Sequence, residues 1–232
     1  MSAYAELHCL SYFSFLRGAS SPQELVSQAA SLGYRALAIT DECSLAGVVK
    51  AYVEAEKTKT HLIIGSEFVL TNGCRLVVLV TDKAAYCELS GLITLARRRS
   101  PKGAYHVEMN DLPFRLKHGL LIWLPGGDAA LNRQHGEQLT KLFPCRLWMG
   151  VEHLLDGAEQ RRYLSHYRLA CSLKLPMVAC GGVQMHKPER KKLHDVLQAI
   201  RLNKPVQELG TTLASNAQAY LKPIAQLQAL YP

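Results

Sequence analysis

The sequence predicts an α/β protein in which a mainly parallel sheet is covered by helices on its faces. Short apolar, β-branched segments alternate with amphipathic segments at helical spacing along the chain. The strand-like segments are apolar without interruption, as expected for parallel strands buried on both faces. Polar residues close several of them, an arrangement that α/β barrels use to gather active-site side chains at the carboxyl ends of their strands. The residues in these positions are His8, Asp41, Glu42, Glu67, Glu152 and His153.

Seven strands and seven helices are expected along the chain. The first helix begins with Ser21 as its N-cap and Pro22 in its first turn, and Gly33 follows its last residue. The last helix, 216–230, is interrupted by Pro223, which lacks the amide hydrogen that a helix needs. The expected strands are 6–10, 36–40, 62–70, 75–81, 120–124, 147–151 and 176–180, and the other helices are 46–56, 83–98, 129–142, 158–172 and 188–201.

The third and fourth strands are joined by Thr71-Asn72-Gly73-Cys74 alone. This connection is too short for a parallel crossover, so it predicts a hairpin with Asn-Gly at its tip. Seven strands can close into a barrel or lie as an open doubly wound sheet. Because the chain contains neither G-x-G-x-x-G nor G-K-[ST], the phosphate-binding patterns of open nucleotide-binding sheets, we favour the barrel.

Length and composition limit the class of protein. With 232 residues and 48% hydrophobic content, the chain can bury one large α/β core or two small ones. Seven cysteines without a C-x-x-C pair argue against a disulfide framework and favour the reducing cytoplasm. No apolar run reaches about 18 residues, so no transmembrane helix is expected.

The chain is basic, with a net charge of +8, which favours a polyanionic neighbour such as nucleic acid. The basic residues cluster near the ends of expected helices, where a solvated helix face is the alternative explanation. Those that could face DNA are Arg97, Arg98, Arg99, Lys187, Arg190 and Lys191.

Each polar strand end admits two interpretations. His8 is either a hydrogen-bonded core residue or a ligand. Asp41 and Glu42 are adjacent carboxylates that repel each other unless a cation, donors or water compensates them. Alternatively, Asp41 or Ser44 caps the following helix. Glu67 lies in an otherwise apolar run, where a carboxylate is rarely buried unless it is paired or coordinates a metal.

These segments together resemble the motifs of the polymerase and histidinol phosphatase (PHP) family. Residues 6–19, ELHCLSYFSFLRGA, resemble its first motif, 38–42, AITDE, the second, and 63–67, IIGSE, the third. The resemblance is closest to the amino-terminal PHP domain of bacterial error-prone DNA polymerases, C-family relatives of the replicative polymerase alpha subunit. Further support comes from residues 45–49, 92–99 and 194–201.

The resemblance implies a distorted seven-stranded β/α barrel of TIM-like form. Active members hold up to three metals at the strand ends, and some hydrolyse phosphoesters or proofread DNA. Several ligand positions of the family are replaced in this chain. Leu10 stands where the first motif has a second His, Arg17 where it often has another ligand, and Gly182 and Gln184 where the last motif has an Asp-X-His pair. The remnant ligand positions are His8, Asp41, Glu42, which replaces the second motif's His, and Glu67.

These replacements imply a structural domain without catalytic activity, because hydrolysis at such a site requires metals that activate water. We expect no cofactor and at most one weakly bound Mg²⁺, Mn²⁺ or Zn²⁺ ion. His186 could substitute as a ligand, whereas a packing or surface role is expected for His194. Two alternatives stay open: a residual metal-dependent phosphoesterase or 3′–5′ exonuclease, and a basic nucleic-acid-binding module.

The resemblance also implies that the chain is part of a cytoplasmic polymerase used in damage-induced mutagenesis and translesion synthesis. Residues 1–210 would form the PHP barrel, and residues 211–232 a helix that leads to the polymerase core, whose palm holds Mg²⁺. The implied partners are that core, DNA, mutagenesis accessory proteins and the sliding clamp, with no membrane.

Overall fold

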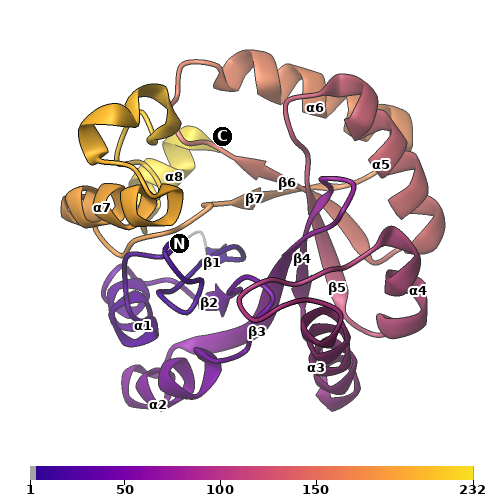
Figure 1. Ribbon diagram of the computed structural model, residues 1–232, viewed down its shortest axis with the longest axis horizontal. Coiled ribbons are helices and arrows are strands. Elements are labelled where there is room, and N and C mark those ends of the chain that lie inside the picture. The colour runs from indigo at the N-terminus through magenta and orange to yellow at the C-terminus, as the bar shows by residue number, and fades with distance from the viewer. Residues whose placement is uncertain (1–3, 232) are drawn as a thin grey trace.

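The computed structural model describes residues 4–231 and shows a β/α barrel with helices around its outside (Figure 1). One sheet contains seven strands in the order β1 to β7, which is also their order in the sequence. The strands are β1 (Ala5–Glu6), β2 (Ala36–Ile39), β3 (His61–Val69), β4 (Arg75–Leu79), β5 (Leu120–Leu124), β6 (Leu147–Glu152) and β7 (Met177–Cys180). The helices are α1 (Pro22–Ser31), α2 (Val48–Thr58), α3 (Lys83–Arg98), α4 (Leu112–Arg115), α5 (Ala129–Leu142), α6 (Glu159–Leu173), α7 (Lys191–Leu202) and α8 (Ile224–Leu230).

The sheet is parallel except at β4, which runs antiparallel to both of its neighbours, β3 and β5. The predicted hairpin is therefore confirmed, and Gly73 at its tip has a φ of +82°, a conformation that favours glycine. Beyond β7 and β1 the described residues close the barrel with one bridge, Cys9 with Val183. This seam is supported by amide hydrogen bonds from Leu10 to the Val183 carbonyl and from Val183 to the His8 carbonyl.

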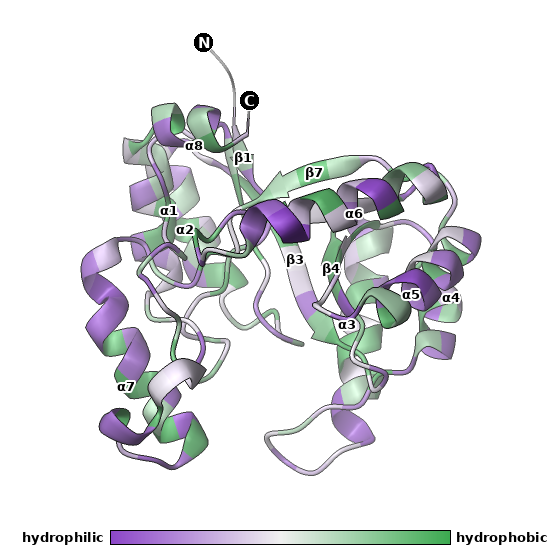
Figure 2. Cartoon of the chain, turned by 90° about the horizontal axis from the view of Figure 1, so that it is seen from above, coloured by the Kyte–Doolittle hydropathy of each residue, from purple (hydrophilic) through white to green (hydrophobic). Residues whose placement is uncertain are grey.

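Apolar side chains fill three regions of the molecule. One lies between the sheet and α3, α5 and α6, and its largest buried side chains include Phe68 and Trp123. A second joins α1, α2 and α8 to β2. The third is a smaller cluster that links residues of β2, β4, β5 and β7. The outer helices present hydrophilic residues on part of their surface (Figure 2), as expected when only one face of each helix is buried.

The first helix forms as predicted. Ser21 accepts a hydrogen bond from the Glu24 amide, and the Glu24 carboxylate accepts one from the Ser21 amide, which completes a capping box. The expected strand at 6–10 is shorter, because only Ala5 and Glu6 pair with β2. After Glu6 the backbone takes a different path, because the Glu6 carboxylate accepts hydrogen bonds from the backbone amides of His8 and Gly181.

The expected helix at 216–230 is wrong in its first half. Residues 216–222 are irregular, the Tyr34 hydroxyl donates to the Lys222 carbonyl, and only Ile224–Leu230 is helical. This short helix contributes Leu227 to the same apolar cluster as α1. Residues 1–3 and 232, which the expected domain bounds include, lie outside the described residues. Within residues 4–231, no helix is both long and apolar enough to cross a membrane.

Burial separates two phenylalanines and gives a test of the core. Phe68 is fully buried in the large outer cluster, whereas the Phe15 side chain is 80% exposed. We expect Phe68→Ala to lower the free energy of unfolding by about 3–5 kcal/mol through lost burial and a cavity. Phe15→Ala, the matched control, should change it by less than about 0.5 kcal/mol. Urea denaturation of both variants measures this, and equal losses would contradict the placement of the core.

Candidate functional site

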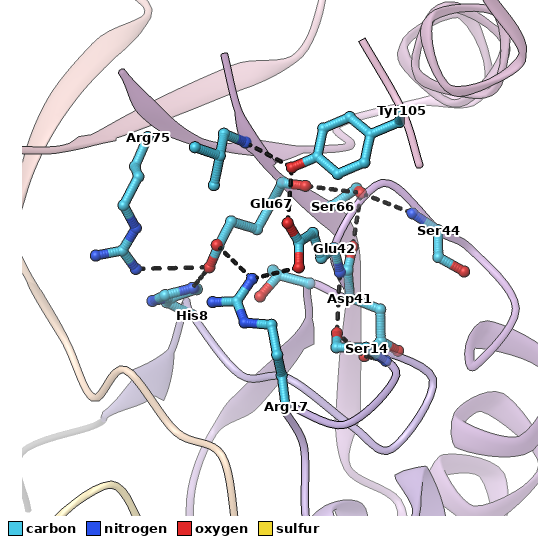
Figure 3. A network of polar contacts seen from close by, with 12 residues as sticks. His8, Ser14, Arg17, Asp41, Glu42, Ser44, Ser66, Glu67, Arg75 and Tyr105 are labelled. Carbon is cyan, nitrogen blue, oxygen red and sulfur yellow. Dashed lines mark hydrogen bonds and ion pairs between the residues drawn. The ribbon is translucent and has the colours of Figure 1, made fainter. Parts of the chain in front are cut away.

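Polar side chains from four strand ends meet at one end of the barrel, and Figure 3 shows those from the first three, His8, Glu42 and Glu67. His8 follows β1, Glu42 follows β2, Glu67 lies in β3, and Glu152 is the last residue of β6. Parallel strands direct their carboxyl ends to the same face, which explains why residues far apart in sequence come together. The structure thus brings three of the predicted positions, His8, Glu42 and Glu67, into one network.

His8 lies between two carboxylates. Its Nε2 is 2.5 Å from Glu67 Oε2, and its Nδ1 is 2.7 Å from Glu152 Oε1. The His8 and Glu67 side chains are almost completely buried. An imidazole with an acceptor at each nitrogen is best satisfied when both nitrogens carry protons. We therefore assign His8 as a cation in this network.

Arg17 connects the carboxylates of Glu42 and Glu67. One terminal nitrogen, Nη1, lies 2.6 Å from Glu42 Oε2 and 3.0 Å from Glu67 Oε1. Arg75, the first residue of β4, approaches the other Glu67 oxygen at 3.6 Å. The Tyr105 hydroxyl donates to the remaining oxygen of Glu42 at 2.8 Å and accepts a hydrogen bond from the Val69 amide.

The network is electrically balanced by the protein's own side chains. Three carboxylates, Glu42, Glu67 and Glu152, face two guanidinium groups and the His8 imidazolium. Burial alone would lower the pKa of His8, but hydrogen bonds with Glu152 and Glu67 raise it to about 9. Burial likewise would raise the pKa of Glu67, but the hydrogen bond from His8 and the nearby positive charges hold it well below its ordinary value.

Asp41 has a different role from its neighbour Glu42, because it binds the loop that carries Arg17. Its carboxylate accepts hydrogen bonds from the amide and the hydroxyl of both Ser11 and Ser14, at 2.7–3.1 Å. The Ser14 hydroxyl also accepts one from the Glu42 amide. Burial raises the pKa of Asp41, and these four hydrogen bonds oppose the rise. Asp41 therefore fastens the segment that carries Arg17 to the end of β2, and the helix-cap alternative does not describe it.

Three of the four positions where the resemblance implies a lost ligand, Leu10, Gly182 and Gln184, give the network no side-chain contact within residues 4–231, whereas the fourth, Arg17, is part of it. Leu10 is fully buried. Gly182 has a φ of +56°, and a Cβ built on it would lie 2.8 Å from Glu152 Oε1. The backbone amide of Gln184 donates to the Ala219 carbonyl, and its backbone carbonyl accepts a hydrogen bond from the Ala19 amide. Glu152 fills the space beside Gly182 that a larger residue would need.

The two further histidines lie outside the network. His186 Nδ1 is 2.8 Å from the Ser20 hydroxyl, and no contact joins it to the carboxylates of the network in the described part of the chain. His194 is buried on α7, in agreement with a packing role. Neither residue compensates for the replaced ligands.

The donors at this end of the barrel are already used within the protein. Both nitrogens of His8 and both oxygens of Glu67 are already engaged by protein partners. Within residues 4–231, no group of three or more His, Cys, Asp or Glu side chains has an arrangement that could hold a metal ion. The positively charged Arg17 lies between the two carboxylates where a cation would bind. The donor set therefore does not fit a centre of two or three metals.

Sequence reasoning missed two members of the network, Arg75 and Tyr105, which lie outside the recognised motifs. It placed Glu152 at a strand end without assigning it a role. The hairpin register offers a signal for Arg75, because it pairs with Val69, two residues after Glu67. Tyr105 lies in an irregular segment after α3, and no sequence pattern points to it.

The six basic residues proposed to face DNA differ in their surroundings. Four of them are engaged within the domain. The Arg97 guanidinium donates to the carbonyls of Cys43 and Ala104 and lies over the Tyr105 ring, whereas Arg98 and Lys187 are exposed. The paired residues are Arg99 with Asp111, Arg190 with Glu24, and Lys191 with Asp195.

Comparison with known proteins gives a consistent picture. The family model described as "PHP domain" matches residues 6–160. The chain is 53% identical over 230 residues to an error-prone DNA polymerase of Teredinibacter turnerae, covering 99% of this chain and 22% of that protein. It is 49% identical over 229 residues to an error-prone DNA polymerase of Saccharophagus degradans, with the same coverage of 99% and 22%. The chain thus spans about a fifth of the length of these curated relatives.

A solved structure supports the fold alone. An amidohydrolase from Chromobacterium violaceum, with bound sulfate and no metal, is similar with a TM-score of 0.57 and 15% sequence identity. The similarity covers 79% of this chain and 88% of that chain. The TIM-like α/β fold predicted from the sequence is therefore confirmed.

Removal of Arg17 tests the charge balance. Arg17→Met keeps much of the apolar stem but leaves Glu42 and Glu67 without their shared cation. Breaking a buried ion pair from one side leaves an uncompensated charge, so we expect a loss of about 3–5 kcal/mol in the free energy of unfolding. Arg98→Met, the control, removes an exposed arginine and should cost less than about 0.5 kcal/mol. Chemical denaturation measures both, and equal effects would refute the bridging role of Arg17.

His8 gives the network a pH dependence. Because its pKa of about 9 in the fold lies above the ordinary value of 6.5, the protonated form is stabilised by folding. This stabilisation is complete below about pH 6.5 and is lost as the pH rises through about 9. Unfolding of the native chain and of His8→Gln, followed across this range, should show a steeper loss in the native chain. Parallel curves would show that His8 is not protonated in the fold.

Proposed function

This chain belongs to the PHP domain family, and on that premise we propose that it is the amino-terminal domain of an error-prone DNA polymerase. Two relatives with that name align with 99% of the chain at 53% and 49% identity, and the aligned region makes up 22% of each. Such a polymerase would act in damage-induced mutagenesis and translesion synthesis. Nucleotide transfer would take place elsewhere in the longer polypeptide, in a palm with carboxylate-held Mg²⁺.

Within that protein, the domain has a structural role and a degenerate metal site. The observation that carries this proposal is the Arg17 guanidinium, which bridges Glu42 and Glu67. A metal-dependent hydrolase uses its cation to lower the pKa of bound water and to stabilise the displaced oxygens. A guanidinium has no open coordination position and stays protonated, so it neutralises the carboxylates without activating water. The network therefore stabilises the barrel end and carries no hydrolytic chemistry.

The wider assignments follow from the same proposal. Residues 1–210 would form the barrel domain, and residues 211–232 would lead toward the polymerase core. The partners would be that core, DNA, mutagenesis accessory proteins and the sliding clamp, in the cytoplasm. Of the basic residues proposed for DNA, Arg98 and Lys187 are the better candidates, because they are exposed and no ion pair with a carboxylate is found for them within residues 4–231.

Metal analysis together with a nuclease assay tests the structural role. We expect purified chain to carry well under one equivalent of Mg²⁺, Mn²⁺ or Zn²⁺, and to release no nucleotides from single-stranded DNA when Mn²⁺ is added. Glu67→Gln serves as the matched variant, since it removes the central carboxylate with little change of shape. One equivalent or more of metal, with Mn²⁺-stimulated cleavage that Glu67→Gln abolishes, would establish the phosphoesterase alternative instead.

A further inference from the structure

Among the described residues, helices cover the outer face of β7 only in part. The residues of β7 are only partly buried until Cys180, although the strand is hydrophobic (Figure 2). In a β/α barrel, the helix that follows a strand normally packs back on the sheet. Here α7, which follows β7, packs against two neighbouring short helical turns, at Pro188–Arg190 and Val206–Glu208. An open groove of about 950 Å³ consequently runs along β7 between α6 and α8.

A row of rings lines this groove. His153 lies 4.8 Å from Tyr231 and 5.8 Å from Tyr163, measured between ring centroids, and Tyr163 is stacked on Tyr167 at 6.1 Å. Tyr163 and Tyr167 are 38% and 49% exposed. Exposed tyrosines beside an apolar strand are typical of protein interfaces, because they bury a large area with little loss of rotamer freedom.

The charge of the groove argues against nucleic acid as its ligand. Among the residues that line the groove, Lys174 is the one lysine or arginine, and Glu159 carries a negative charge that balances it. Binding to a phosphate backbone depends on several lysine and arginine contacts. The apolar residues Met177 and Ala179 of β7, which line the groove, instead fit an apolar protein segment.

The matched relatives indicate which protein segment this is. The region aligned with this chain makes up 22% of each, so most of each polypeptide lies outside this fold. Leu230 and Tyr231 line the groove, and the Tyr231 hydroxyl is held by the carbonyls of Val151 and Cys180. A polypeptide that continues past residue 231 therefore leaves the barrel at the edge of the groove.

From these observations we propose that the groove between α6 and α8 is the surface on which the polymerase portion of the same polypeptide docks. The inference rests on the proposed function, since it requires that larger protein. An apolar segment of the polymerase portion would cover β7 and take the place of the missing helix. The aromatic row would form the centre of the interface, with Glu159 and Lys174 at its rim.

Hydrogen exchange measured by mass spectrometry tests the docking surface. The 232-residue chain is compared with the complete polypeptide of which it forms the amino-terminal part. We expect peptides covering 160–180 to exchange at least about tenfold more slowly in the complete polypeptide, because docking suppresses local opening. Peptides from α2, on another side of the barrel, serve as the internal reference. Equal exchange of 160–180 in both proteins would overturn the proposal.

A pair of exposed tyrosines supplies matched variants of the complete polypeptide. Tyr167→Lys places a charge in the groove, and Tyr52→Lys places one on α2, where the tyrosine is 55% exposed. Tyr167→Lys should remove most of the protection of 160–180, and Tyr52→Lys should leave it unchanged. Equal loss of this protection in both variants would overturn the proposal. Concentration-dependent dimerisation of the 232-residue chain that protects 160–180 to the same degree would also overturn it.

Primer extension by the complete polypeptide tests the polymerase assignment separately from the docking surface. Failure to extend a primer with Mg²⁺ refutes the polymerase assignment whatever the exchange pattern. Extension without protection of the groove refutes the docking surface alone.

Discussion

The site depends on one electrostatic constraint: three carboxylates lie together at a partly buried barrel end and require cations close by. Isolated charges in such a place are strongly disfavoured, and Glu67 is fully buried. Arg17 and protonated His8, from the segment after β1, and Arg75, from β4, meet the requirement. The loop that carries Arg17 must consequently be held in place. Both carboxylate oxygens of Asp41 do this by accepting hydrogen bonds from Ser11 and Ser14. The charge balance of the carboxylates therefore depends on the structure of the loop that carries Arg17.

The barrel provides the place for this network regardless of the chemistry performed there. Because the strands bring their ends to one face, the frame accommodates Leu10 and Gly182 at positions where the family resemblance implies metal ligands. The absence of a side chain at Gly182 even creates the space that Glu152 occupies. A barrel end of this kind can therefore hold a set of internal ion pairs in place of a metal centre without a change of fold.

Much of the fold could be predicted, because apolar periodicity and the Asn-Gly hairpin report on local structure. The failures have physical causes. The expected strand after Glu6 and the expected helix at 216–222 were overridden by tertiary hydrogen bonds to Glu6 and Lys222. At the site, motif positions identified His8, Glu42 and Glu67, whereas Arg75 and Tyr105 depend on register and on an irregular loop. Such contacts are set by the closed barrel and leave little trace in a single sequence.

The central claim is that Arg17 stands in for a metal cation between Glu42 and Glu67. Calorimetric titration with Mn²⁺ of the native chain and of Arg17→Met tests it most directly. The account predicts no binding to the native chain up to about 1 mM and one Mn²⁺ bound more tightly than about 1 mM in Arg17→Met, because two carboxylates then lack their cation. Binding of Mn²⁺ to the native chain that Arg17→Met leaves unchanged would contradict it.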